Sequence, residues 1–376
     1  MPASPRSDRR ACGTSTRFAL MAGILVLAVS GTSGQQPFNP AGTLPVLESY
    51  LEALRVQSGI PGMSAAVVRD GVIVWEKGFG FQNVATRLRA TPDTPYLVGD
   101  MSETLAAVLL LQCVEQRRLG LDEPFRRLAV DGIEPDATLR QILSHAAPES
   151  MKEPFVYNPE RYAQLTPVME WCAPQPYRKS VAHRILNRLA MKDSVPGTDL
   201  QDPDLPLPPG LFAPEDLDHY RQVLARLAVP YKVDGKGRAE RNDLPGVPMS
   251  AAGGLVSTVR DLARLDTELD LNATTDRSVL LQPETLAVAW NPAGERGGVT
   301  SPMGLGWFVQ SYKGERIVWH FGYVLNGYSS LIVKVPARGL TFILLANGDG
   351  LSAPFQLQSG DVTRSLFATL FLRLAI

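Results

Sequence analysis

Apolar residues recur at helical spacing near the start of the chain and again in its first third. An amphipathic helix is predicted over residues 39–59, where leucines return every three or four positions: Leu44, Leu47, Leu51 and Leu54. A second helix is predicted over residues 101–117, with one apolar face made of Leu105, Val108, Leu109 and Cys113. Shorter helical patterns continue as far as Leu189, so the middle of the chain reads as mainly helical.

Short apolar runs at both ends of the chain predict strands. Runs at 64–68 and 72–75 flank Asp70-Gly71, and Asp-Gly between two such runs is typical of a β-hairpin. The glycines Gly78 and Gly80 are expected to end the second strand. Further strands are predicted towards the C-terminus, before a final apolar helix: 305–310, 316–319, 329–335 and 340–346. The pattern favours an α/β (α+β) fold, an antiparallel sheet built from both termini with helices inserted between them.

Composition excludes one class of partner. Among 376 residues the formal net charge is −1, and no run of Lys and Arg stands out beyond the N-terminus. Nucleic-acid binding depends on a concentrated positive surface, so we expect no nucleic-acid partner. No cofactor motif is apparent, and we expect neither a cofactor nor a resident metal. We also expect a monomer.

The N-terminus has the features of an export signal. Four arginines precede an apolar run over Phe18–Val29, and small residues follow up to Gly34. We therefore expect residues 1–34 to be removed, leaving an exported protein, periplasmic or extracellular, with no membrane span. An uncleaved anchor is the alternative, but the run is shorter than the roughly 20 residues a bilayer needs. Cys113 and Cys172 would remain after cleavage. Both are expected to be buried free thiols in helices, although an exported protein could also pair them.

Several short motifs occur in one order along most of the chain. They are Ile60-Pro61-Gly62, Thr91-Pro92-Asp93-Thr94, Leu119-Gly120-Leu121-Asp122, Gly253-Gly254-Leu255-Val256 and Gly304-Leu305-Gly306-Trp307. Together they resemble the superfamily of class C-type serine β-lactamases, low-molecular-weight penicillin-binding proteins and related esterases. The resemblance implies a β-lactamase/transpeptidase-like domain. Its sheet part would comprise residues 35–99 and 251–376, and its helical part residues 100–250.

The resemblance also locates the catalytic positions. Family members carry Ser-x-x-Lys at the start of the central helix, where the Ser attacks a carbonyl and the Lys takes its proton. The matching tetrad here is Asp100-Met101-Ser102-Glu103, which puts Asp100 at the nucleophile position and Glu103 at the lysine position. Ser102 is a poor substitute nucleophile, because its neighbour one turn later is Leu105, which cannot act as a base.

Two further family motifs are partly kept. The family's Tyr-x-Asn reads Tyr157-Asn158-Pro159, so the Tyr survives while Pro159 replaces the substrate-positioning Asn. The family's Lys/His-x-Gly reads His320-Phe321-Gly322, and the N–H of Tyr323 would form half of the oxyanion hole by analogy. The resemblance therefore implies Asp100, Glu103, Tyr157 and His320 as the catalytic positions. It implies Pro159, Gly322 and Tyr323 as the substrate-binding ones. The family's His-Thr-Ser-Gly turn is altered too, to His145-Ala146-Ala147-Pro148.

Three interpretations of the altered site follow. Asp100 and Glu103 could form a helix N-cap and capping box, leaving a catalytically inactive homologue that still binds a ligand in the cleft. Alternatively, Asp100, Glu103, Tyr157 and His320 could form a nonstandard hydrolytic site, or, with two carboxylates and an imidazole, hold a divalent cation. A third interpretation is a binding module for cell-wall or small-molecule ligands.

Overall fold

The computed structural model describes residues 39–147, 151–274 and 280–376. The predicted export signal lies outside the described residues. The described residues form one compact unit. Within the described part, no helix is both long and apolar enough to cross a bilayer.

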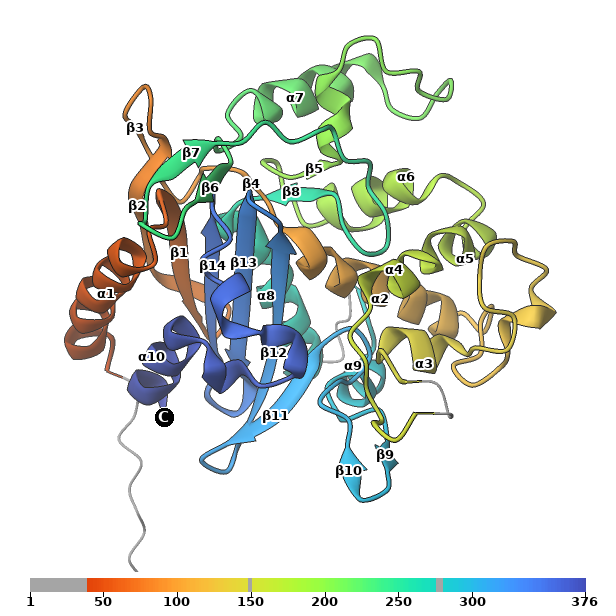
Figure 1. Ribbon diagram of the computed structural model, residues 1–376. Coiled ribbons are helices and arrows are strands. Elements are labelled where there is room, and N and C mark those ends of the chain that lie inside the picture. The colour runs from red at the N-terminus through yellow and green to blue at the C-terminus, as the bar shows by residue number, and fades with distance from the viewer. Residues whose placement is uncertain (1–38, 148–150, 275–279) are drawn as a thin grey trace, which may run out of the picture. The chain divides into compact units, whose positions relative to one another are not determined.

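A seven-stranded antiparallel sheet forms the centre of this unit, and it joins the two ends of the chain as predicted (Figure 1). Its strand order is β11-β12-β13-β14-β1-β2-β3, so the C-terminal strand β14 pairs with the N-terminal strand β1, for example Ala65 opposite Leu344. The strands span Phe308–Tyr312 (β11), Glu315–Val324 (β12), Tyr328–Val335 (β13), Leu340–Ala346 (β14), Gly62–Arg69 (β1), Val72–Asn83 (β2) and Leu88–Arg89 (β3). Smaller sheets pair β4 (Tyr96–Leu97) and β5 (Val195–Pro196) with β8 (Leu255–Ser257), β6 (Tyr231–Val233) with β7 (Ala239–Arg241), and β9 (Glu295–Arg296) with β10 (Val299–Thr300).

The predicted hairpin is present, but its second strand is longer than expected. Asp70 and Gly71 both have positive φ, 49° and 78°, as a two-residue turn matching the strand twist requires. Gly78 and Gly80 do not end β2, which continues to Asn83. A Cβ on Gly78 would lie 2.0 Å from the carbonyl oxygen of Ala90, so this glycine lets another segment cross the strand.

Helices cover both faces of the sheet (Figure 1). On one face, α1 (Pro40–Gln57) and α10 (Leu366–Ala375) pack on residues such as Phe342 and Leu344. On the other, α8 (Val259–Thr274) packs on β1 and β14. The remaining helices are α2 (Ser102–Glu115), α3 (Leu139–Leu143), α4 (Pro159–Ala163), α5 (Leu165–Cys172), α6 (Tyr177–Val181), α7 (Pro214–Leu224) and α9 (Pro283–Ala289). The result is a β-lactamase/transpeptidase-like arrangement, an antiparallel sheet with helices on both faces and further helices from the middle of the chain.

The central helix α2 is more deeply buried than its sequence pattern predicts. Every residue from Ser102 to Cys113 is buried, so the helix has no solvent face. It packs against α5 and α6 as well as the large core that includes Ile343 and Leu345 of the sheet. A helix that is apolar on most sides is typical of such a central position.

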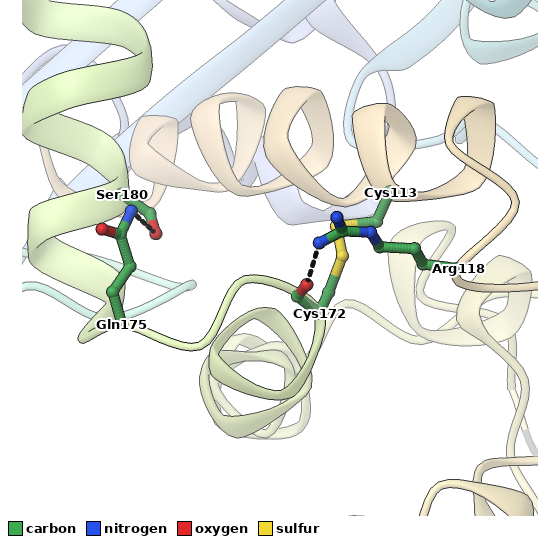
Figure 2. Close-up of a disulfide and its surroundings, with 5 residues drawn as sticks. All are labelled: Cys113, Arg118, Cys172, Gln175 and Ser180. Carbon is green, nitrogen blue, oxygen red and sulfur yellow. Dashed lines mark hydrogen bonds between the residues drawn. A yellow bond between two sulfur atoms is a disulfide. The ribbon is translucent and has the colours of Figure 1, made fainter.

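A disulfide joins α2 to α5, which corrects the expectation of two free thiols (Figure 2). Cys113 and Cys172 have a Cα–Cα distance of 6.4 Å. Beside it, the Arg118 guanidinium donates a 2.7 Å hydrogen bond to the Cys172 carbonyl, as Figure 2 shows. Helical spacing within each segment gave no information on this pairing, because the two cysteines meet only when α2 and α5 pack.

Candidate active site

Asp100 and Glu103 do not form the expected capping box. A short 3₁₀ turn, η1 (Gly99–Met101), runs directly into α2, and neither element has a side-chain cap hydrogen bond. The backbone of Val98, one residue before η1, is already near helical values at φ −88° and ψ −2°, whereas a capping residue needs an extended backbone. Asp100 therefore lies within the turn, and the carboxylate of Glu103 is directed elsewhere.

Glu103 lies between two buried histidines. Its Oε2 is 2.9 Å from Nε2 of His145 and 3.4 Å from Nε2 of His320. The side chains of Glu103 and His320 are 0% exposed and that of His145 is 1% exposed. These residues come from α2, from the turn after α3 and from β12, so the fold joins three distant segments at one carboxylate.

The hydrogen bonds define where the protons lie on these histidines. Nδ1 of His145 accepts a 3.0 Å bond from the N–H of Asn158, so its proton is on Nε2 and is donated to Glu103. Nδ1 of His320 is 2.7 Å from the carbonyl oxygen of Phe321, an acceptor only, so this nitrogen carries a proton. Nε2 of His320 and the facing Glu103 oxygen then need a further proton to form a hydrogen bond. His145 is thus hydrogen-bonded to the backbone on one side and to Glu103 on the other, whereas His320 is bonded to the backbone and only approaches Glu103.

This arrangement separates the pKa values of the two carboxyls. Burial raises the pKa of Glu103, but His145 and His320 together outweigh burial and hold that pKa below its usual value. Burial, followed by the negative charge of Glu103, raises the pKa of Asp100 well above its usual value. Asp100 keeps some exposed surface, whereas Glu103 has none. Glu103 is therefore the buried anion, and Asp100 is the carboxyl favoured to hold a proton.

Tyr157 lies beside both carboxyls and also packs in an aromatic group. Its ring centroid is 4.5 Å from that of His145 and 5.2 Å from that of Phe321. Burial, then the charges of Glu103 and Asp100, raise the pKa of Tyr157 well above its usual value. Its hydroxyl is close enough to influence Asp100, yet it makes no hydrogen bond of good geometry within the described residues.

Pro159 has a clear local role in the structure. Asn158 is the N-cap of α4 and its side chain accepts from the N–H of Arg161, while Pro159 is the first helical residue. Proline suits this position because it lacks an N–H that the helix would leave unpaired. The same short helix carries Tyr162, whose hydroxyl donates a 3.1 Å bond to the Glu103 carbonyl.

At Gly322 and Tyr323, strand β12 comes into close contact with η1. A Cβ on Gly322 would lie 1.8 Å from the Val98 carbonyl oxygen, and one on Gly99 would lie 2.7 Å from the Tyr323 nitrogen. Ser330 fixes this contact by donating a 2.7 Å bond to the same Val98 carbonyl. The two glycines thus allow β12 and the turn before the central helix to touch, with the Tyr323 amide next to Gly99.

Ser102 is part of the scaffold. Its hydroxyl donates to the Gly99 carbonyl at 2.8 Å and accepts from the Leu255 N–H at 3.3 Å, and the side chain is fully buried. These bonds tie η1 to β8 and keep the Ser102 hydroxyl engaged inside the protein.

The structure brings together the four predicted catalytic positions and adds one residue. His145 was seen in the sequence only as part of an altered turn, 42 positions from Glu103. A charged residue inside an apolar helix needs a partner, and the chain has only four histidines. His145 could therefore have been considered from the sequence as a partner of Glu103. As for a divalent cation, no group of three or more His, Cys, Asp or Glu within the described residues is arranged to hold one.

Comparisons with known proteins agree with this architecture. The octameric penicillin-binding protein homologue from Pyrococcus abyssi superposes with a TM-score of 0.69 at 22% identity, covering 88% of this chain and 77% of that one. A crystal structure titled SurE superposes with a TM-score of 0.64, also at 22% identity, covering 83% of this chain and 73% of the other. At this level of identity both show the fold alone.

Two curated relatives are similar in sequence. The unguisins hydrolase ungD' of Aspergillus campestris is 24% identical over 332 residues, 77% of this chain and 58% of the relative. Protein flp of Staphylococcus aureus is 26% identical over 107 residues, 27% of this chain and 22% of its own length. The matched region thus spans less than two thirds of either relative. The family model described as Beta-lactamase matches residues 47–361, most of the chain, and the chain therefore belongs to the beta-lactamase family.

Proposed function

We propose that this chain is a beta-lactamase-family protein that does not form an acyl-enzyme and that retains ligand binding around Asp100. The observation that carries the proposal is the environment of Glu103. Its carboxylate is fully buried and held by His145 at 2.9 Å. A group at the lysine position has to receive a proton from a nucleophile, and here that group is a carboxylate already hydrogen-bonded to His145.

The chemistry at Asp100 supports the same conclusion. Acyl transfer by this family requires a hydroxyl nucleophile activated by a neighbouring base. Asp100 has no hydroxyl, and the raised pKa of its carboxyl favours the protonated, non-nucleophilic form. Ser102, the nearest hydroxyl in sequence, is buried and bonded to Gly99 and Leu255.

The charge of the site also argues against the anionic substrates that the family resemblance implies. Replacing a lysine by Glu103 changes the local charge by two units, and Asp100 adds a second acidic group. Charges about 4 Å apart interact by roughly 4 kcal/mol at an effective dielectric near 20, so an anionic ligand is disfavoured here.

An active hydrolase with a nonstandard site is the second candidate, and one observation favours it. Neighbouring carboxyls whose pKa values are driven apart are typical of acid–base pairs, and Asp100 and Glu103 behave in this way. In that case Asp100, which is partly exposed, would act as the general acid. The similarity to a protein named as an unguisins hydrolase is compatible with this alternative.

We further propose an exported protein, acting in the periplasm or outside the cell as a monomer on a small-molecule or cell-wall-type ligand. The Cys113–Cys172 disulfide supports export, because such bonds persist mainly in oxidising compartments.

Turnover of p-nitrophenyl esters tests the proposal against its alternative. The wild-type protein is expected to release p-nitrophenol no faster than buffer. Hydrolysis that is lost in Asp100→Ala, but kept in the matched surface variant Asp218→Ala, would establish the nonstandard hydrolase instead.

A further inference from the structure

Several buried polar atoms in the Asp100–Glu103 region lack a partner. In the described residues, Oε1 of Glu103, the hydroxyl of Tyr157 and Nε2 of His320 make no hydrogen bond of good geometry. Native proteins rarely leave such atoms unpaired, and each one calls for an explanation. Here three occur around one carboxylate, which distinguishes this place from an ordinary acidic cluster.

The groups around this point share a chemical character. The carboxyls of Asp100 and Glu103 accept hydrogen bonds when ionised, and the phenol oxygen of Tyr157 can also accept. Glu103 lies close enough to both others for its charge to raise the pKa of each. No Lys or Arg contributes to the pKa shifts of Asp100 or Glu103 within the described residues.

Access is from the side of Asp100. Asp100 keeps partial exposure, and so does part of Tyr157, although the Tyr157 hydroxyl itself is buried. Glu103, His145 and His320 are buried. His145 is already paired on both ring nitrogens, with the Asn158 N–H and with Glu103, so it is not available to a ligand. A ligand group therefore meets Asp100 first and has the Tyr157 hydroxyl and the charge of Glu103 behind it.

We propose that Asp100, Tyr157 and Glu103 form a binding site for the primary ammonium group of a ligand whose remaining part extends towards solvent. An ammonium group complements these acceptors, because it has three N–H donors and no hydrogen-bond acceptor. Its positive charge also offsets the repulsion between the two neighbouring carboxyls. A bound ammonium would take over the role of the Asp100 proton, which otherwise reduces the repulsion between the two carboxyls. This inference rests on the ligand binding proposed above and specifies the chemical class of that ligand.

The test compares three probes of equal length: n-butylammonium, n-butanol and n-butyrate, titrated into the full chain by isothermal calorimetry. Saturable binding of n-butylammonium alone is expected, with an affinity that rises with pH as Asp100 loses its proton. Equal binding of n-butanol, preference for n-butyrate or absence of saturable binding would each overturn the inference, the last indicating that water alone satisfies these atoms.

Variants define the site. Asp100→Asn is expected to weaken n-butylammonium at least about tenfold, the loss of roughly one charge-assisted hydrogen bond. Tyr157→Phe is expected to weaken it severalfold, which gives a second measurement should Asp100→Asn fold poorly. The control is Glu48→Gln, a carboxylate beside a separate surface hollow of about 520 Å³ between α1 and β2, and it should bind as wild type does. Unchanged affinity in both Asp100→Asn and Tyr157→Phe would refute the site.

This outcome is separable from failure of the proposed function. A covalent penicillin adduct would refute the absence of acylation without bearing on ammonium binding. Loss of amine selectivity in a protein that forms no adduct would refute only the ligand class.

Discussion

At the scale of single residues, Glu103 depends on His145. The histidine donates to Oε2 of Glu103 and accepts from the N–H of Asn158; Glu103 and His145 are buried and Asn158 is half-buried. Removing it leaves a buried carboxylate with one weaker partner and a backbone N–H with none.

His145→Phe is therefore expected to lower the free energy of unfolding by about 2–4 kcal/mol, since each unpaired buried group costs roughly 1–3 kcal/mol. Urea titration followed by circular dichroism measures this change. His183→Phe is the matched control, because His183 is exposed, and it should change stability by less than about 0.5 kcal/mol. Equal effects of the two substitutions would show that the Glu103–His145 bond is not stabilising.

The sequence predicted which residues lie near one another better than it predicted their contacts. The motif order placed Asp100, Glu103, Tyr157 and His320 together, and the structure brings them together. The capping box was wrong, because η1 continues directly into α2 and leaves Asp100 without an extended backbone. The partner of Glu103 could not be read from local spacing, since His145 reaches it only through the packing of the turn after α3 on α2.

At the scale of elements, two different interactions fix helices in place, one between two helices and one between a helix and the sheet. The first is the disulfide between α2 and α5, which closes a loop of 59 residues. The second is a buried ion cluster in which Lys334 on β13 contacts Asp266 and, at 2.7 Å, Asp270, both on α8. Lys334 also lies 5.5 Å from the ring centroid of Trp290.

Replacing both cysteines, Cys113→Ala with Cys172→Ala, is expected to reduce stability by about 2–4 kcal/mol, because a closed loop of this length restricts the unfolded chain. The measurement is the urea midpoint of the variant, compared with the wild type under oxidising conditions. Reduction of the wild type should reproduce the same loss. A variant as stable as the oxidised wild type would mean that the cross-link contributes nothing to the packing of α2 on α5.

Asp266 predicts a pH dependence of stability. Burial raises its pKa to about 6, even though Lys334 acts in the opposite direction. A carboxyl whose pKa is higher in the folded state binds more protons when folded, so stability from this group falls as pH rises from about 4 to about 6. Asp266→Asn should flatten the stability curve in that window, measured by thermal unfolding across pH. A curve as steep as that of the wild type would assign the dependence to other groups.

Lys334→Met would leave the carboxylates of Asp266 and Asp270 without their buried cation. Removing one partner of a buried pair typically costs about 3–5 kcal/mol, and urea unfolding should show a loss of this order. Arg241→Ala breaks the exposed pair with Asp243 and serves as the control, with an expected loss under about 1 kcal/mol. Similar losses in the two variants would contradict the structural role of the cluster.

The apolar pattern predicted some strands of the sheet more closely than others. It located β13 and β14 to within one residue, because both strands are buried almost throughout and so appear as continuous apolar runs. The strand predicted at 316–319 instead extends to Val324 as β12, and the one predicted at 305–310 begins only at Phe308 as β11. The length of β2 and the complete burial of α2 depend on segments distant in the sequence that pack against them, such as Ala90 against Gly78. Such contacts leave no mark in the local pattern of apolar residues, so the sequence did not predict them.

At the scale of the whole molecule, the chain keeps the beta-lactamase-family architecture while its central residues serve different interactions. The sheet, η1 and β12 still meet at Gly99 and Gly322, where the Tyr323 amide lies. At that place lie a buried Glu103 hydrogen-bonded to His145 and an Asp100 whose pKa is raised by burial and by the charge of Glu103. The fold thus belongs to the family, whereas acylation is an activity that we propose the protein has lost.

Intact-mass spectrometry after incubation with a fluorescent penicillin tests this central claim most directly. The wild-type chain is expected to keep its unmodified mass at every incubation time. The variant Asp100→Ser combined with Glu103→Lys is the informative comparison, because an adduct in that variant would show that the remaining site is competent. A wild-type protein whose mass increases by that of the penicillin would contradict the account.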